Sequence, residues 1–312
     1  MSGTERRSLW AGILVAITTP FGSDGNVDRP AFVRHAGWLV ERGVDGIIVA
    51  GSLGEGSTLS SEERGSLVTA LTSELPERVP VIAAVAAART SDVVAQARAA
   101  RNAGARGLLV LPPYVYQADR TEINAHFAAV FRATDLPCML YNNPSAYGTD
   151  VGAEQVLELA EEHPTLSAVK ESSGDVRRIT ALRALLGDRL DVTVGLDDVV
   201  LEGLYAGAVG WVAGLANALP EESVALFRDG AGGEPLRAAE LYRWFLPLLR
   251  MDTGPKFVQQ IKLVEEELGL GSSRVRPPRQ ELRDGERQAT LATLRECLAR
   301  RPALRADERT AG

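Results

Sequence analysis

One lysine ends a short apolar segment, a position where a buried amine can do covalent chemistry. Lys170 closes residues 166–170, which read Leu-Ser-Ala-Val-Lys. Apolar surroundings disfavour the ammonium form, and lowering a lysine pKa from about 10.4 to about 7 costs roughly 4 to 5 kcal/mol. The neutral amine can then attack a carbonyl carbon and form an imine. A structural ion pair with Glu171 is the alternative interpretation.

Two further features have the chemistry to assist such an amine. Tyr141 ends the apolar segment 137–141, and a phenol there can pass protons to and from a reacting substrate. The glycine-rich run 51–56 lets backbone N–H groups approach an anion closely, and its Ser52 adds a hydroxyl donor. The structural alternatives are a core tyrosine and an ordinary glycine-rich turn.

The elements that position these residues alternate along the chain. Short apolar runs predict strands buried on both faces, over residues 12–18, 46–50, 80–85, 107–111, 137–141, 166–170, 191–195 and 210–214. Amphipathic stretches between them predict helices over residues 30–42, 61–75, 92–103, 122–133, 153–163, 175–186 and 197–206. Ser60 and Glu63 have the spacing of a capping box, and Thr90 to Asp92 offer N-cap oxygens.

Eight such βα units predict an α/β fold, a (β/α)8 TIM barrel with a C-terminal helical appendage. A doubly wound open sheet is the alternative, but no GxGxxG motif follows a strand. Helices without intervening strands are expected over residues 221–229, 237–250, 255–268 and 285–300. We therefore divide the chain into a catalytic barrel (8–225), a C-terminal helical region (226–300) and a disordered tail (301–312).

Composition narrows the function classes. The net charge of -7 and the absence of a basic stripe argue against a nucleic-acid partner. No apolar run is long enough for a membrane span or a signal peptide, and Cys138 and Cys297 fit no redox or metal spacing. The three histidines show no metal-ligand spacing either. We expect a cytoplasmic protein without a metal.

Four segments, in this order, carry a resemblance to a known family: 16–21 with 24–28, 51–55, 141–144 and 169–171. Over roughly residues 10–295 the chain resembles the dihydrodipicolinate synthase / N-acetylneuraminate lyase family, the class I Schiff-base aldolase superfamily. The resemblance implies a Schiff base at Lys170, a proton shuttle at Tyr141, and carboxylate binding by Gly51, Ser52 and Leu53. It also implies a homotetramer that needs no cofactor and acts on a small 2-oxo acid or cyclic imino acid.

Three positions depart from the synthase pattern of that family. Leu53 replaces the second threonine of a proton relay, Val115 aligns with the relay tyrosine of a neighbouring subunit, and Ala146 aligns with a substrate-binding arginine. Tyr114 and Tyr116 are the candidates to replace the relay tyrosine from the neighbouring subunit. We therefore do not expect a typical dihydrodipicolinate synthase.

Further residues are expected to line the substrate site: Tyr147, Gly195, Asp197, Trp211 and Val212. The expected function is an aldolase or dehydratase acting on a hydroxylated 2-oxo acid. The loop 51–55 and the segment 141–148 also resemble a 1-pyrroline-4-hydroxy-2-carboxylate deaminase, which is the alternative. A 4-hydroxy-tetrahydrodipicolinate synthase and a non-catalytic sensor of small acids are less favoured.

Overall fold

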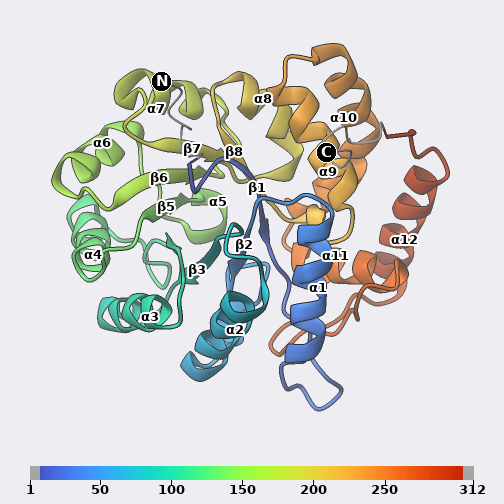
Figure 1. Cartoon of the computed structure of the whole chain (residues 1–312), viewed down its shortest axis with the longest axis horizontal. Coiled ribbons are helices and arrows are strands. Elements are labelled where there is room, and N and C mark those ends of the chain that lie inside the picture. The colour runs from blue at the N-terminus through green and yellow to red at the C-terminus, as the bar shows by residue number, and fades with distance from the viewer. Residues whose placement is uncertain (1–7, 305–312) are drawn as a thin grey trace.

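Eight parallel strands close into a barrel in sequence order, with β8 paired to β1 (Figure 1). The computed structural model describes residues 8–304. The strands are β1 (Gly12–Ala16), β2 (Gly46–Val49), β3 (Val81–Val85), β4 (Gly107–Val110), β5 (Cys138–Asn142), β6 (Leu166–Glu171), β7 (Asp191–Val194) and β8 (Gly210–Ala213). The fold is a TIM barrel, as predicted, and each predicted strand matches an observed one within two residues at either end.

Helices surround the barrel on the outside (Figure 1). The barrel helices are α1 (Arg29–Glu41), α2 (Ser61–Glu74), α3 (Thr90–Asn102), α4 (Arg120–Arg132), α6 (Ala153–Glu162), α7 (Arg177–Leu186), α8 (Val200–Tyr205) and α9 (Pro220–Ala231). The C-terminal helices are α10 (Pro235–Leu249), α11 (Phe257–Glu267) and α12 (Asp284–Leu298). They gather at one side of the barrel, beside α1, α8 and α9.

The core has two layers because side chains of a strand alternate between the two faces of the sheet. Inside the barrel, alternate residues pack together; Trp10, Met139, Tyr141, Ala168 and Val212 belong to this inner cluster. The intervening residues of the same strands pack outward against the helices. Almost all strand residues are buried, which explains their continuous apolar runs.

Of the two helix N-caps predicted from the sequence, the structure contains one. Ser60 caps α2, and Ser60 and Glu63 form the predicted capping box. The N-cap predicted at Thr90 to Asp92 was wrong. The helix α3 begins at Thr90 itself, Arg89 precedes it without a side-chain cap, and the Thr90 hydroxyl is hydrogen-bonded to Nδ1 of His126 instead.

Two features of the chain's organisation differ from the prediction, and a third lies mostly outside the described residues. A short helix, α5 (Pro144–Tyr147), was not predicted; the Asn143 side chain accepts from the backbone N–H of Ala146 to start it. The division placed after residue 225 falls inside α9, and the tail predicted for 301–312 lies mostly outside the described residues.

No helix within 8–304 has the length and apolar character needed to cross a membrane.

Candidate active site

Lys170 and Tyr141 are paired residues on neighbouring strands. Lys170 on β6 lies in register with Tyr141 on β5, and both point into the barrel because Ala168 and Met139, two residues earlier, also face inward. The Nζ atom of Lys170 is 4.1 Å from the centroid of the Tyr141 ring. The fold thus brings the predicted amine and phenol together at the carboxyl ends of the strands, where TIM barrels carry their active sites.

The Lys170 amine is buried without a carboxylate bound to it. Burial lowers the pKa of Lys170 below its usual value, against the opposing influence of Asp252, Tyr147 and Asp197. No ion pair or hydrogen bond of Nζ is formed with any residue of the described chain. Glu171 points to the other side of β6, where it accepts hydrogen bonds from the Asn142 side chain and the Ser173 backbone. The structural ion pair between Lys170 and Glu171 is therefore not present.

A glycine makes room for the lysine side chain. A Cβ atom at Gly195 would lie 2.6 Å from Cε of Lys170, and it would also collide with the Ser172 hydroxyl. That hydroxyl is buried and has no hydrogen-bond partner among the described residues. Gly195, which follows β7, thus permits the position of the amine instead of supplying a functional group.

Two tyrosines and a serine line the same cavity as Lys170. The Tyr141 hydroxyl accepts a hydrogen bond from Asn143 Nδ2 at 3.1 Å, and burial raises the pKa of Tyr141. The Tyr147 ring meets the Tyr141 ring edge to face, 5.6 Å between centroids. The Tyr147 hydroxyl is hydrogen-bonded to Ser52 Oγ, and burial raises the pKa of Tyr147 as well. Both phenols are therefore protonated and able to donate at neutral pH.

The loop after β2 lines the same cavity and carries backbone N–H groups that are free to bind a ligand. The backbone N–H groups of Ser52 and Leu53 form no hydrogen bond within the described chain. Glu55 fixes the loop from below, since its buried carboxylate binds Lys262 Nζ at 2.8 Å and the backbone N–H of Arg276 at 2.9 Å. Gly54 is required here because a Cβ would lie 2.8 Å from the carbonyl oxygen of Ile17. This arrangement can bind a carboxylate.

These residues line one cavity of about 570 Å³ at the barrel mouth. That volume falls within the range of roughly 300 to 1,000 Å³ typical of small-molecule sites. Eight of the predicted site residues line it: Gly51, Ser52, Leu53, Tyr141, Tyr147, Lys170, Gly195 and Val212.

Comparison with known proteins assigns the chain to a family. A sequence model of the dihydrodipicolinate synthetase family matches residues 9–297. The chain belongs to this family. It is a class I Schiff-base lyase of the family, which agrees with the resemblance seen in the four sequence segments.

Among its curated relatives are two 4-hydroxy-tetrahydrodipicolinate synthases. The one from Salinibacter ruber is 34% identical over 256 residues, which cover 81% of this chain and 85% of the relative. Synthase 1 from Streptomyces coelicolor is 35% identical over 283 residues, which cover 90% of this chain and 91% of the relative. A prophage protein of the dihydrodipicolinic acid synthase family from E. coli K12, solved in complex with pyruvate, matches with a TM-score of 0.87 and 27% identity, over 93% of this chain and 99% of that one.

Two residues expected at the substrate site lie elsewhere in this family member. Trp211 faces outward into the layer between barrel and helices, because its neighbour Val212 faces inward and adjacent strand residues alternate. Its Nε1–H donates to Asp197 Oδ1 at 2.9 Å. Asp197 is fully buried and also accepts from the backbone N–H groups of Gly214 and Leu215. We therefore correct both expectations: Trp211 and Asp197 support the site from behind its wall.

The tyrosines proposed as replacements for the relay tyrosine differ in their surroundings. Tyr114 is partly buried, and its ring lies 6.1 Å from the ring of Tyr147 in the same chain. Tyr116 is 55% exposed and Val115 is 64% exposed. Tyr114 is thus already close to the cavity of its own chain, whereas Tyr116 projects outward.

Two charged residues of the cavity were missed in the sequence. Asp252 lies in the turn after α10, with its carboxyl against Gly214, where a Cβ would be 2.7 Å from Oδ2. Burial raises the pKa of Asp252 well above its usual value. Arg279 reaches the cavity from the loop between α11 and α12. Neither residue follows a strand, so the strand-end rule that found Lys170 and Tyr141 gave no signal for them.

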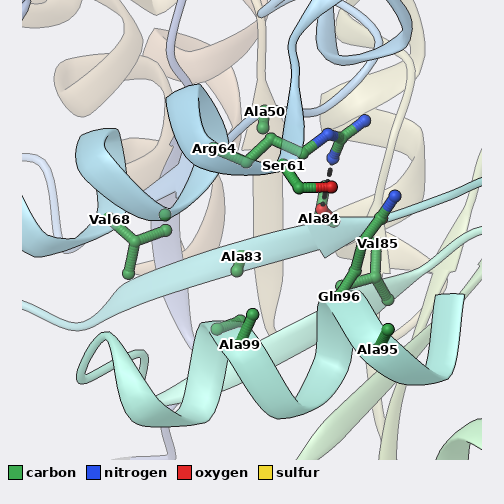
Figure 2. A pocket seen from close by; sticks show the side chains of 12 residues that line it. Ala50, Ser61, Arg64, Val68, Ala83, Ala84, Val85, Ala95, Gln96 and Ala99 are labelled. Atoms are coloured by element: carbon green, nitrogen blue, oxygen red, sulfur yellow. Dashed lines mark hydrogen bonds between the residues drawn. The ribbon is translucent and has the colours of Figure 1, made fainter. Parts of the chain in front are cut away.

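A second cavity, of about 200 Å³, lies between α2, α3 and β3 (Figure 2). It shares no lining residue with the cavity at Lys170, and alanine and valine side chains form most of its wall. Arg64 extends from α2 to donate from Nη1 to the carbonyl oxygen of Ala84 at 3.1 Å. Burial lowers the pKa of Arg64. This cavity offers no nucleophile beside an acid or base, so the cavity at Lys170 is the candidate active site.

The described part of the chain holds no group of three or more histidine, cysteine or carboxylate side chains arranged to bind a metal ion. The two carboxyls that act electrostatically on the amine, Asp252 and Asp197, lie in different surroundings. Asp252 lines the cavity, whereas Asp197 is enclosed behind its wall. The ionisable groups that line the cavity, and so the candidates for acid-base chemistry in it, are Lys170, Tyr141, Tyr147, Asp252 and Arg279.

Proposed function

We propose that Lys170 forms the Schiff base and that Tyr141 carries the protons. The observation that supports this most directly is the pairing of a buried, unpaired amine with a protonated phenol in one cavity. The amine attacks the C2 carbonyl carbon of a 2-oxo acid, and the oxygen leaves as water after protonation. The iminium carbon then accepts the electron pair released when a bond next to it breaks. We assign the substrate's 1-carboxylate to the free N–H groups of Ser52 and Leu53.

The proposed substrate is a hydroxylated 2-oxo acid, cleaved by an aldolase or dehydrated by a dehydratase. Both reactions pass through an enamine between C2 and C3, which forms when the C3–C4 bond breaks in the aldolase reaction and when a base removes a C3 proton in the dehydratase reaction. Aldol cleavage breaks the C3–C4 bond and leaves the C4 hydroxyl as a carbonyl, whereas dehydration expels that hydroxyl as water. Each needs a group that moves a proton to or from the hydroxyl oxygen. Tyr141 and Tyr147 supply such groups in the cavity wall.

The names of the curated relatives raise 4-hydroxy-tetrahydrodipicolinate synthase as another candidate. Two residues of this chain weigh against it. Leu53 and Ala146 both line the cavity, at the positions where we align a relay threonine and a substrate-binding arginine in the synthases. A leucine side chain cannot relay protons, and an alanine cannot bind a carboxylate. We therefore rank the synthase activity below the dehydratase and aldolase activities.

A 1-pyrroline-4-hydroxy-2-carboxylate deaminase is the second candidate. It is favoured by the hydrogen bond between Ser52 and Tyr147, which joins the two sequence segments that resemble that enzyme. In this reaction Lys170 attacks the ring imine carbon, water is lost from C4, and ammonia is released on hydrolysis. Ammonia release distinguishes this activity from an aldolase or a dehydratase.

Assembly is part of the proposal. We expect a homotetramer, in which the exposed segment around Val115 and Tyr116 is covered by a second subunit. Sedimentation equilibrium of the purified chain tests this, and a monomer at micromolar concentration would contradict it.

Reductive trapping tests the proposed chemistry. Borohydride added with pyruvate should fix one covalent adduct on Lys170, located by peptide mass spectrometry, and Lys170→Ala should abolish it. Lys256→Ala is the matched control because Lys256 is exposed and lies outside the cavity. Absence of an adduct with any 2-oxo or cyclic imino acid would contradict the proposal. An adduct without turnover of any candidate substrate would favour a sensor over an enzyme.

A further inference from the structure

The cavity at Lys170 is lined by two basic side chains, and only one of them has a proposed role. Lys170 lines it from β6, and Arg279 lines it from the loop that joins α11 to α12. The rest of the lining is neutral apart from Asp252, whose carboxyl interacts electrostatically with Lys170 and not with Arg279. On a chain with a net charge of -7, a local positive charge of this kind marks where an anion binds.

The Arg279 side chain has no anionic partner in its own chain. Within residues 8–304, no carboxylate lies within ion-pair distance of its guanidinium, and no hydrogen bond of that group is formed. Two nearby arginines differ: Arg276 forms a two-pronged ion pair with Glu63 at 2.8 and 2.9 Å, and Arg287 pairs with Glu266 at 2.9 Å. Arg279 is half-buried, so its charge is partly removed from water without a compensating protein anion.

The backbone that carries Arg279 is held in place. The backbone N–H of Arg279 donates to the carbonyl oxygen of Arg276 at 3.2 Å. Arg276 is fixed in turn by Glu63 through its side chain and by Glu55 through its backbone N–H, at 2.9 Å. Glu55 also ends the loop that carries the unbonded N–H groups of Ser52 and Leu53, two residues that line the cavity. The loop of Ser52 and Leu53 and the segment that carries Arg279 are thus both connected to one buried carboxylate.

We propose that Arg279 binds a second anionic group of the substrate, so that the substrate is a 2-oxo acid with a carboxylate at its far end. This inference rests on the proposed function, because it assumes that the first carboxylate and the reacting carbon lie at Ser52–Leu53 and Lys170. A guanidinium binds a carboxylate through two parallel N–H···O bonds, which fixes the orientation of the far end as well as adding affinity. A cavity of about 570 Å³ has room for a chain longer than pyruvate. Arg279 would act as a specificity-determining residue and would not touch the reacting carbon.

The test compares two probes that share the reacting group. Pyruvate has one carboxylate, and 2-oxoglutarate has a second one remote from the keto carbon. Borohydride trapping as a function of acid concentration gives a half-saturating concentration for each. In Arg279→Gln we expect that of 2-oxoglutarate to rise about 10- to 100-fold, as for loss of a charge-assisted hydrogen bond, and that of pyruvate to change less than about 3-fold. Arg279→Lys should lie between Gln and the natural residue.

Arg274→Gln is the matched control, since Arg274 is an exposed arginine of the same loop whose side chain does not line the cavity. It should leave both half-saturating concentrations unchanged. Equal effects of Arg279→Gln on the two acids, or no effect on either, would overturn the inference while leaving the Schiff base intact. If neither acid is trapped, the proposed function fails, and calorimetric binding of 2-oxoglutarate then decides the anion site. Binding that Arg279→Gln abolishes would support it, and no binding would overturn it.

Discussion

The ammonium-forming nitrogen of Lys170 lies over the ring of Tyr141, 4.1 Å from its centroid, and the two residues are in register on neighbouring strands. This places the phenol beside any imine that Lys170 forms. Tyr141→Phe keeps the ring and removes the proton carrier, so adduct formation with pyruvate should slow by about 10²- to 10⁴-fold. Rapid-quench borohydride trapping measures the rate.

The unfolding midpoint of Tyr141→Phe serves as the control for structure. The phenol hydroxyl accepts a hydrogen bond from Asn143, so a loss of about 1 kcal/mol of stability is expected. A variant that traps pyruvate at the natural rate would exclude Tyr141 as the proton carrier.

The pH dependence of trapping reports the state of the amine. Only neutral Lys170 attacks, and burial lowers the pKa of Lys170 below 10.5, so the rate should rise with pH and level off well below pH 10.5. The Asp252 carboxylate opposes this shift by favouring the ammonium form. Asp252→Asn should therefore move the midpoint of the profile to lower pH. A shift to higher pH, or none, would contradict the electrostatic assignment.

The alternation of side chains along strands explains which site residues the sequence predicted correctly and which it did not. Lys170 and Tyr141 were found because each ends a buried strand, and the barrel gathers strand ends in one place. The same periodicity could have excluded Trp211, because adjacent strand residues cannot both face inward and Val212 was also assigned to the cavity.

The cavity residues that come from outside the strands could not be predicted from the sequence. Asp252 and Arg279 come from connections among the C-terminal helices, and the pattern of those helices does not show how they dock on the barrel. The ion pair between Glu55 and Lys262 could likewise not be predicted, because the two residues are more than 200 positions apart in the sequence. Such long-range pairings depend on tertiary packing and leave no local signal.

The space at Gly195 makes a steric prediction. In Gly195→Ala the new Cβ would lie 2.6 Å from Cε of Lys170, so the lysine must leave its position over Tyr141 for the chain to fold. We expect at least a 10-fold loss of trapping rate, since small misplacements of reacting groups are costly. Gly37→Ala is the control, because Gly37 lies in α1 with open space around it. Equal trapping rates in the two variants would contradict the steric argument.

Asp197 makes the last prediction, on stability. Burial raises the pKa of Asp197 to about 6 from 3.8, so the folded state holds its proton at a pH where the unfolded chain has released it. The contribution of this carboxyl to folding is therefore present at low pH and lost as the pH rises from about 4 to about 6, by up to roughly 3 kcal/mol.

Asp197→Asn removes that titration and also an acceptor for Trp211, Gly214 or Leu215. It should lower the free energy of unfolding by about 1 to 3 kcal/mol at pH 4, and the deficit should narrow as the pH rises through 6. Urea unfolding of both proteins at several pH values measures this difference. Asp188→Asn, at an exposed side chain, should change stability by less than about 0.5 kcal/mol throughout. A deficit for Asp197→Asn that widens with pH would show that the carboxylate form is the one the fold prefers.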